Sequence, residues 1–454
     1  MTRGAPRRIL LVDADAFFVA VARLVDPEGA GRAERLIVGG AADGRGVVCS
    51  ASYAVRRFGV RSGMPVRQAV RRCPDALCVP VPRAACAAKS REIAAVLARW
   101  APVVQPSSID EWYLDLGGTE ALYAEPLAAT AARIRDAVRA ATGLGVSIGA
   151  GTSRLVAKVA VEVAKPGAGG SGVHAVAPGE EAEFLLRFDL PALPFVGPKL
   201  AARLARLGLR TVADARALSE EALGGLLGER TGRWLWRWVR GLDDAPVAPR
   251  AEAKSVSREE TFAQDVHDDA ALERELLRLA GRVGADLRGD GLRARTVTVK
   301  LRDADFVTRQ AARTLPAPIE GDRAIAEVAG ALLARLRRAR RVPVRLVGIA
   351  LSHFGEAAPP AQLALFDAAA SGGAAADAAP AAVETERDRR LAHTLDAIRG
   401  RFGREAIGPA ALLAPAASPP PRPGGPGRPG HAGRPPRAAG SEPGGRVPGS
   451  DDAG

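Results

Sequence analysis

Cysteine is scarce in this chain of 454 residues, which has only four. None of them forms a Cys-X-X-Cys pair, and no histidine lies nearby to complete a zinc site. The pattern therefore argues against a disulfide scaffold and a zinc module. We interpret the four as buried, reduced thiols, which fits a cytoplasmic protein. They are Cys49, Cys73, Cys78 and Cys86.

Long hydrophobic runs are also missing. No stretch of about 20 uncharged apolar residues occurs, so the sequence predicts no membrane-spanning helix and no membrane partner. Three arginines precede an apolar run at 9–12, as in a signal peptide. Asp13 and Asp15 interrupt this run, so no signal-peptide core forms.

Lysine is rare as well, with six copies among 64 basic residues, although the formal net charge is +13. Such an excess of positive charge favours a polyanionic partner, and nucleic acid is the leading candidate. A GC-rich genome that encodes arginine freely explains part of the same excess. The chain is 47% hydrophobic and long enough for two to four domains with substantial cores.

Strand-like and helix-like patterns alternate over about the first 180 residues. Apolar, β-branched segments predict strands, and apolar residues at helical spacing predict helices. Alternation in this order is typical of an α/β or α+β domain. The expected strands cover 8–13, 36–39, 46–50, 112–116 and 144–150. One expected helix starts at Phe17, two others cover 84–100 and 119–142, and a fourth follows the strand at 144–150 and ends at Lys165. A turn is expected at 105–108.

The rest of the chain divides by composition. Residues 183–243 show short helical patterns without a clear strand, and a polar linker follows. Residues 254–354 indicate a second α/β-type domain, with strands at 296–301 and 344–352 and a basic amphipathic helix at 321–341. Beyond it we expect one short helix at 384–402. Residues 414–454, rich in proline, glycine and arginine, cannot bury a core and are predicted to be disordered.

Acidic residues lie at the ends of two hydrophobic strands. Asp13 ends the first strand, and Asp110 and Glu111 begin another. A buried acid is costly unless it is neutralised, and three converging acids repel each other. A divalent cation resolves this, and oxygen ligands suit magnesium or manganese.

Two such ions are the usual device for in-line displacement at phosphorus. Adjacent residues point to opposite faces of a regular strand, so Asp110 and Glu111 can share a site only near a turn. The segment 106–108 supplies that turn. Helix capping or an ordinary surface position remains an alternative for any one of these acids.

At this point the motifs resemble a known family. Residues 12–18, and residues 108–111 with 113–115, resemble the two catalytic motifs of the Y-family DNA polymerases, and among these the bacterial DNA polymerase IV type. The resemblance extends over about residues 8–354, in order and with the family spacing. It implies an α+β, right-hand polymerase fold with a ferredoxin-like palm, small fingers, a helical thumb and an α/β little-finger domain.

The resemblance also implies domain boundaries. They are a palm at 1–180 with fingers inserted at about 22–80, a thumb at 181–244, a linker at 245–253, a little finger at 254–354, and a largely disordered tail at 355–454.

For the active site, the resemblance implies that Asp13 and Asp110 are the principal ligands of two Mg²⁺ ions. Glu111 would complete the site near the primer terminus, and the Ala14 carbonyl would contact the nucleotide-bound metal. Phe18 falls where the family has a steric gate that excludes the ribose 2′-hydroxyl. Phe17 is interpreted as a core residue.

Two further motifs imply nucleotide contacts. Residues 46–65 resemble the fingers motif, so Tyr53 and Arg56 would contact the incoming triphosphate with Ser50 nearby. Guanidinium and phenol groups suit phosphate oxygens. Residues 153–158 and 164–167 resemble the last palm motif, where Lys165 would meet the β- and γ-phosphates. Lys158 could equally belong to a solvated helix face.

DNA contacts follow from two other regions. Residues 193–199 resemble the thumb's helix–hairpin–helix, whose backbone N–H groups bind phosphate without reading sequence. Residues 254–262 resemble the start of the little finger. The arginines of 335–341 would follow the DNA backbone, although a solvated helix face also explains them.

The sequence departs from the family pattern at four positions. Ala22 stands where the family usually has Glu, Trp112 replaces a small residue beside Glu111, Phe195 replaces a hairpin glycine, and Gly167 replaces Asn. None of the four removes an expected metal ligand.

The tail contains one short motif. Gln362, Leu363, Leu365 and Phe366 lie in a five-residue segment that resembles the peptide by which bacterial polymerases bind the sliding clamp. Apolar anchors and a hydrogen-bonding glutamine on a mobile peptide suit such docking. An accidental apolar patch in an alanine-rich linker is the alternative.

The sequence thus predicts a DNA-directed DNA polymerase that adds dNTPs to a primer, with primer–template DNA, dNTP and the clamp as partners and a monomeric state. Low fidelity and lesion bypass come from the resemblance alone. The main rival is a non-catalytic, clamp-binding Y-family scaffold, and a two-metal nuclease is more distant. All three acids are present, which disfavours the scaffold.

Overall fold

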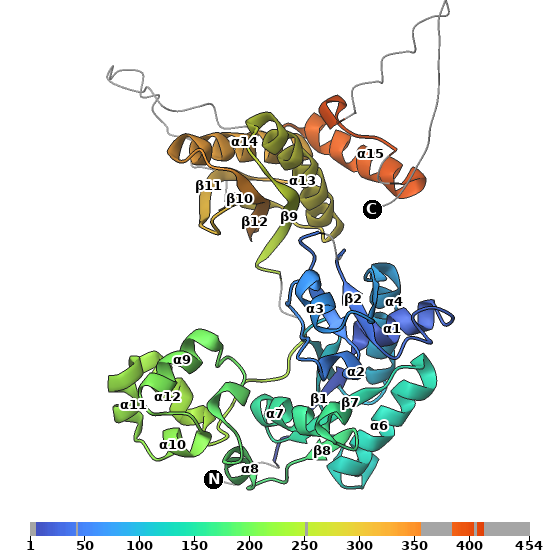
Figure 1. Ribbon diagram of the computed structural model, residues 1–454, viewed down its shortest axis with the longest axis vertical. Helices are drawn as coiled ribbons and strands as arrows, with labels where there is room; N and C mark the ends of the chain where they lie inside the picture. Colours follow the sequence, from blue (N-terminus) through green and yellow to red (C-terminus); the bar gives the residue numbers. More distant parts are fainter. Residues whose placement is uncertain (1–5, 42–43, 250–252, 356–383, 404–405, 413–454) are drawn as a thin grey trace, which may run out of the picture. The chain divides into compact units, whose positions relative to one another are not determined.

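The structure is a computed structural model that describes residues 6–41, 44–249, 253–355, 384–403 and 406–412 (Figure 1). The chain divides into two compact units, residues 1–385 and 386–454. None of the helices in the described ranges is long and apolar enough to cross a membrane.

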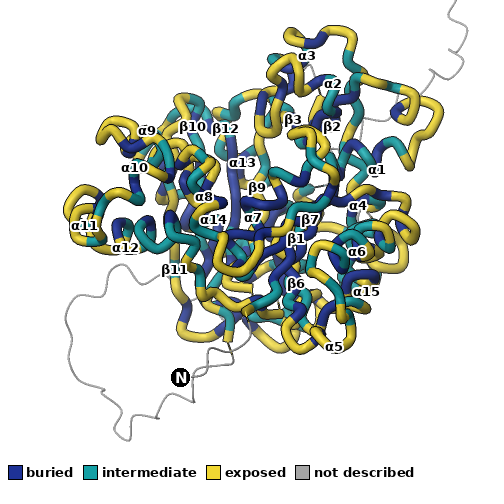
Figure 2. The backbone as a smooth tube through the Cα atoms, turned by 90° about the horizontal axis from the view of Figure 1, so that it is seen from below, coloured by how far each residue is buried: buried dark blue, intermediate teal, exposed yellow. Residues whose placement is uncertain are grey.

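A five-stranded sheet with strand order β5-β6-β1-β7-β8 forms the N-terminal part. The central strand β1 runs antiparallel to both β6 and β7, and every residue of β1 is buried (Figure 2). A run of apolar residues can occupy such a strand because both of its faces are covered. The strands are β1 (Ile9–Ala14), β5 (Val103–Pro106), β6 (Glu111–Asp115), β7 (Val146–Gly151) and β8 (Val173–Ala175).

Helices cover both faces of this sheet. On one face α4 (Arg83–Leu97) and α6 (Leu127–Thr142), together with α1 (Phe17–Val25), pack on alternate strand residues such as Leu10 and Val12. On the other face α7 (Arg154–Ala164) packs on Ile9 and Leu11. Because successive strand residues point to opposite faces, each strand divides its apolar residues between the two cores.

Two expected elements need correction. The helix expected over 119–142 is two helices, α5 (Glu120–Tyr123) and α6. Pro126 is the N-cap of α6, and a proline disfavours the helical backbone conformation at the residue before it, so one continuous helix cannot form. The turn expected at 105–108 lies further on, because residues 105 and 106 still pair in β5. The other expected strands and helices of this part are confirmed within a few residues.

A three-stranded sheet, ordered β3-β2-β4, lies within the same stretch of sequence. A small core of its own holds it together, built around Ile37, Val55 and Val66. Its elements are β2 (Leu36–Gly39), β3 (Val48–Ala51), α2 (Tyr53–Arg56), α3 (Val66–Arg72) and β4 (Leu77–Val79).

The described residues from 181 to 238 form short helices joined by loops, as expected, and no strand. The only β-bridge in this range joins Asp189 and Thr211. Phe195 precedes α9 with a φ of +66°, a conformation that glycine adopts more easily, which explains why a glycine is usual there. The helices are α8 (Glu181–Leu185), η2 (Leu190–Ala192), α9 (Pro198–Arg206), α10 (Val212–Arg216), α11 (Glu220–Leu227) and α12 (Glu229–Trp238). A 3-10 turn, η1 (Pro166–Ala168), links α7 to β8.

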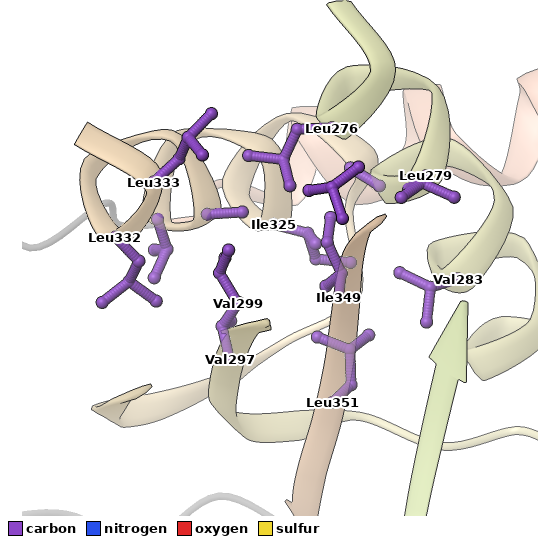
Figure 3. Packing of buried hydrophobic residues seen from close by; sticks show 14 of the residues in the cluster. Leu276, Leu279, Val283, Val297, Val299, Ile325, Leu332, Leu333, Ile349 and Leu351 are labelled. Carbon is purple, nitrogen blue, oxygen red and sulfur yellow. The ribbon is translucent and has the colours of Figure 1, made fainter. Parts of the chain in front are cut away.

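A four-stranded antiparallel sheet, ordered β11-β10-β12-β9, forms the next part. Two helices pack side by side on one face, and their leucine, isoleucine and valine side chains meet those of β10 and β12 (Figure 3). The elements are β9 (Ser255–Val266), α13 (Asp269–Gly289), β10 (Ala294–Asp303), β11 (Thr308–Ile319), α14 (Asp322–Ala339) and β12 (Val344–Phe354). The expected strands and helix are confirmed, and β9, α13 and β11 are added.

The described residues of the second unit include α15 (Glu386–Phe402), where a short helix was expected, and η3 (Ala410–Leu412). The segment 362–366 and residues 413–454 lie outside the described residues.

The close packing of α7 on the sheet depends on Gly149 in β7. A Cβ atom there would collide with the Ala157 carbonyl oxygen and the Val161 amide nitrogen. We therefore expect Gly149→Ala to destabilise the fold by about 1–3 kcal/mol through overpacking, measured as a lower thermal unfolding midpoint.

Gly330 in α14 provides the matched control, because a Cβ atom built there meets no atom within 4 Å apart from its chain neighbours and the backbone of its own helix. Gly330→Ala should keep or raise the midpoint, since alanine favours helix. Equal losses in the two variants would contradict the steric explanation.

Candidate active site

Two carboxylates face each other across the centre of the sheet. Asp13, near the end of β1, pairs in register with Glu111 at the start of β6. Neighbours Val12 and Trp112 point into the α4/α6 core, so Asp13 and Glu111 lie on the α7 face. Only 6% of Asp13 is exposed, which makes its charge expensive without a positive partner.

Two lysines supply that positive charge: Lys158 lies within α7, and Lys165 follows its last residue. The Lys165 ammonium lies 2.8 Å from the Asp13 carboxylate and 2.8 Å from Glu162. Lys158 forms an ion pair with Glu111. The reading of Lys158 as part of a solvated helix face is therefore wrong, because its ammonium contacts a half-buried carboxylate.

Burial and these ion pairs shift the titration of the cluster. Burial raises the pKa of Asp13 to about 7, although Lys165 acts in the opposite direction. Burial also acts to raise the pKa of Glu111, but the hydrogen bond and charge of Lys158 outweigh it and hold that pKa below its usual value. The Lys165 pKa is raised, because the charges of Asp13 and Glu162 outweigh its burial.

Asp110 lies in the bend before β6. Its side chain is therefore not forced to the face opposite to Glu111, as a site shared by the two acids requires. The Ala14 amide donates to the Asp110 carbonyl oxygen at 2.9 Å, so the backbones of the two candidate ligands are adjacent. The Asp110 carboxylate itself accepts a hydrogen bond from Ser108. Across the described residues, no three acidic, histidine or cysteine side chains come together as a metal site.

The residues nevertheless fit a divalent cation. The nearly buried Asp13 and half-buried Glu111 are each neutralised by an ammonium group, so this position already requires positive charge. The available donors are carboxylate oxygens, which suit magnesium or manganese.

The two neighbouring phenylalanines differ in environment. Ala16 adopts a left-handed conformation with φ of +44° and starts α1 directly after the strand. Phe17 is 2% exposed in the core, as expected, whereas Phe18 is partly exposed and meets Phe17 edge to face, with ring centroids 5.5 Å apart. Of the two rings, Phe18 is the more exposed, although it also packs against the neighbouring apolar cores.

The expected triphosphate ligands come from α2 and β3. The Arg56 guanidinium lies over the Tyr53 ring, 4.8 Å from its centroid, and donates through Nε to the Ala51 carbonyl at 2.9 Å. Burial raises the pKa of Tyr53, with a further contribution from the negative charge of Asp15. Ser50, in β3, is buried.

Trp112 does not crowd the site. Its side chain is 1% exposed and packs in the α4/α6 core, on the face opposite to Glu111. The register of β6 explains this, since the residue after Glu111 must point away from it.

Sequence reasoning missed two partners and gave Asp15 no site role. Glu162 contacts Lys165 from three residues earlier on α7, a spacing that could have suggested the pair. Ser108 contacts Asp110, and nothing in its position indicated this. Asp15 accepts a hydrogen bond from Ser147 at 2.7 Å, which is a structural role.

Three family models match the chain. The impB/mucB/samB family matches residues 12–162, and that family's C-terminal domain matches residues 253–365. A model described as the thumb domain of DNA polymerase-iota matches residues 191–243.

Curated relatives and solved structures agree. The chain is 36% identical over 397 residues to DNA polymerase IV of Dehalococcoides mccartyi (strain CBDB1), covering 87% of this chain and 95% of the relative. It is 39% identical over 355 residues to DNA polymerase IV of Methanoculleus marisnigri, covering 78% and 95%. The solved Y-family DNA polymerase chimera Dbh-Dpo4(243-245)-Dbh superposes with a TM-score of 0.68 at 25% identity, covering 77% of this chain and 99% of that one.

These matches, together with the fold and the carboxylate pair, define a DNA-directed DNA polymerase with the α+β, right-hand fold. The chain belongs to the Y family of DNA polymerases, and within it to the translesion enzymes of the DNA polymerase IV type. The expected fold and enzyme class are confirmed, and the non-catalytic scaffold is not favoured. Members of this family use divalent metal ions.

Proposed function

We propose that this enzyme extends a primer 3′ end on a DNA template by two-metal phosphoryl transfer, with Asp13, Asp110 and Glu111 as ligands of two Mg²⁺ ions. The observation that carries the proposal is the pairing of Asp13 with Glu111 in register, on the same sheet face as two lysines. Bound ions of this kind lower the pKa of the attacking hydroxyl and neutralise charge on the phosphates.

The chain's own residues would position the nucleotide. Lys165, now shared between Asp13 and Glu162, would donate to the β- and γ-phosphates as a point charge. Arg56 and Tyr53 would donate to triphosphate oxygens, with Ser50 nearby and the Ala14 carbonyl facing the nucleotide-bound metal. The Phe18 ring would lie under the sugar and leave no room for a 2′-hydroxyl.

We also propose the division into a palm at 1–180 with fingers at about 22–80, a thumb at 181–244, and a little finger at 254–354 joined by the linker 245–253. The spans of the three family models support it, as do the cores of the three-stranded and four-stranded sheets. The core of the helical region 181–244 also includes residues of α7. The thumb hairpin at 193–199 and the arginines of 335–341 would contact the DNA backbone.

For the tail at 355–454 we propose that Gln362, Leu363, Leu365 and Phe366 bind the sliding clamp and raise the effective concentration of enzyme at the primer end. We expect a cytoplasmic monomer, consistent with four free cysteines.

Replacing one proposed ligand tests the catalytic assignment. Asp110→Ala should lower primer extension with Mg²⁺ and dNTPs on the order of 1,000-fold, because a charge-neutralising oxygen is lost at the reacting phosphate. Asp136→Ala is the control, since this α6 aspartate is 65% exposed, and it should keep wild-type activity. Equal activity in the Asp110 variant and wild type would refute the assignment, as would no activity in wild type.

Sugar selectivity tests the gate. Phe18→Ala should raise ribonucleotide relative to deoxynucleotide incorporation by roughly 10- to 100-fold, because the pocket then accommodates the extra hydroxyl. The readout is the ratio of kcat/KM for the two nucleotides. Phe306→Ala, which alters an exposed phenylalanine in the β10–β11 turn, should leave that ratio unchanged. Unchanged selectivity in Phe18→Ala would show that another residue forms the gate.

Clamp binding tests the tail motif. The double substitution Leu365→Ala, Phe366→Ala should weaken binding to a purified bacterial sliding clamp by about 10- to 100-fold, because apolar anchors dominate such contacts. Distributive primer extension without the clamp should not change. Phe402→Ala, at an exposed phenylalanine in α15, is the control. Full binding by the double variant would rule out this peptide.

A further inference from the structure

Phe195 stands at the tip of the tight turn that precedes α9. Its neighbours Leu193 and Val196 are both buried, and the Val196 amide donates to the Leu193 carbonyl oxygen at 3.2 Å. The Phe195 side chain between them is 82% exposed, the largest exposed fraction of any large apolar side chain in the described ranges. The turn therefore presents this ring at the surface.

Two unfavourable features coincide at this position. The exposed ring leaves apolar surface in water. The φ of +66° brings the Cβ atom too close to the following carbonyl oxygen. Glycine, which the family usually has here, would avoid both. Strain and apolar exposure at one residue are typical of a binding surface, because a contact from outside the chain can cover the ring.

Trp238 holds the orientation of the Phe195 ring. The two rings meet edge to face with centroids 5.4 Å apart, and Trp238 contacts Trp234, one turn earlier on α12, with centroids 4.8 Å apart. Phe306 is a useful comparison, because it has the same φ and is 62% exposed, yet the Arg345 guanidinium lies over its ring. The Phe306 ring thus has a cover within the chain, whereas most of the Phe195 side chain remains exposed.

The surface beside this turn suits a polyanion. Gly197 is the N-cap of α9, and the first turn of that helix contains no acidic residue but carries the exposed Lys199. A cation at the positive end of a helix is unfavourable unless an anion lies beside it. DNA offers both groups that fit here, a phosphate for Lys199 and an apolar deoxyribose next to it for the ring. The family model of a polymerase thumb domain spans this region.

We propose that Phe195 packs against a deoxyribose of the bound primer–template, next to the phosphate that the hairpin contacts. The inference rests on the proposed function, in which the hairpin at 193–199 contacts the DNA backbone. It adds a contact that glycine at this position cannot make. Because every nucleotide of the DNA carries the same sugar, this contact strengthens binding without reading sequence.

Equilibrium binding of the full-length enzyme to a labelled primer–template tests the contact. It is measured without dNTP, over a series of salt concentrations, at a temperature at which thermal unfolding shows every variant to be folded. Phe195→Gly should bind about 10-fold more weakly, since burial of part of a phenyl ring corresponds to about this factor in affinity. The slope of log affinity against log salt should not change, because no charge is lost. Phe195→Tyr keeps an aromatic ring and should bind like wild type.

Two further variants are controls. Lys199→Met should bind more weakly and with a slope smaller by about one, the effect of one lost phosphate contact. Leu122→Ala removes another highly exposed apolar side chain, 74% exposed in α5, and should keep the wild-type affinity and slope. Together they separate a lost ionic contact from a general loss of apolar surface.

The outcomes separate this inference from the proposed function. Wild-type affinity in Phe195→Gly overturns the inference, and so does a changed salt slope, because the ring would then act through a phosphate. Weak binding by Phe195→Tyr also overturns it, since a ring would not be sufficient. In each case a weaker Lys199→Met with a smaller slope still supports the hairpin contact. If neither Phe195→Gly nor Lys199→Met weakens binding, the proposed hairpin contact fails and the inference fails with it.

Discussion

The opposition of Asp13 and Glu111 across β1 and β6 is the constraint on which the proposed active site depends. An almost buried carboxylate beside a second one is tolerated only with compensating positive charge. The protein supplies it from α7, where Lys158 within the helix and Lys165 directly after it reach the two acids. We propose that the same pair of carboxylates holds the divalent ions that phosphoryl transfer needs.

Close packing makes this electrostatic arrangement possible. Gly149 lets the α7 backbone approach the sheet, which brings Lys158 within that helix and Lys165 directly after it to the two acids. Gly167, just beyond, lets the Tyr53 ring approach the same turn. At both glycines a Cβ atom would collide with a group that is distant in sequence, and neither glycine has a positive φ.

Much of the site was predictable because the relevant signals are local. An apolar run ending in Asp13 predicts a buried strand with an acid at its end, and the turn before Glu111 predicts that Asp110 escapes strand alternation. The core role of Phe17 also followed, as did most strand and helix positions. The break at Pro126 was readable in principle, since proline disfavours helix at the residue before it.

What the sequence by itself determined was the family, the element order and the candidate ligands, because these depend on motifs and short-range periodicity. Only the tertiary structure decided the pairwise contacts. It placed Trp112 in the core opposite Glu111, paired Lys158 with Glu111, held the Asp110 carboxylate on Ser108, and set Gly167 against Tyr53. Strand register and the packing of helices on the sheet fix these contacts. Both bring together residues that are far apart in the sequence, so a local sequence pattern does not predict the contacts.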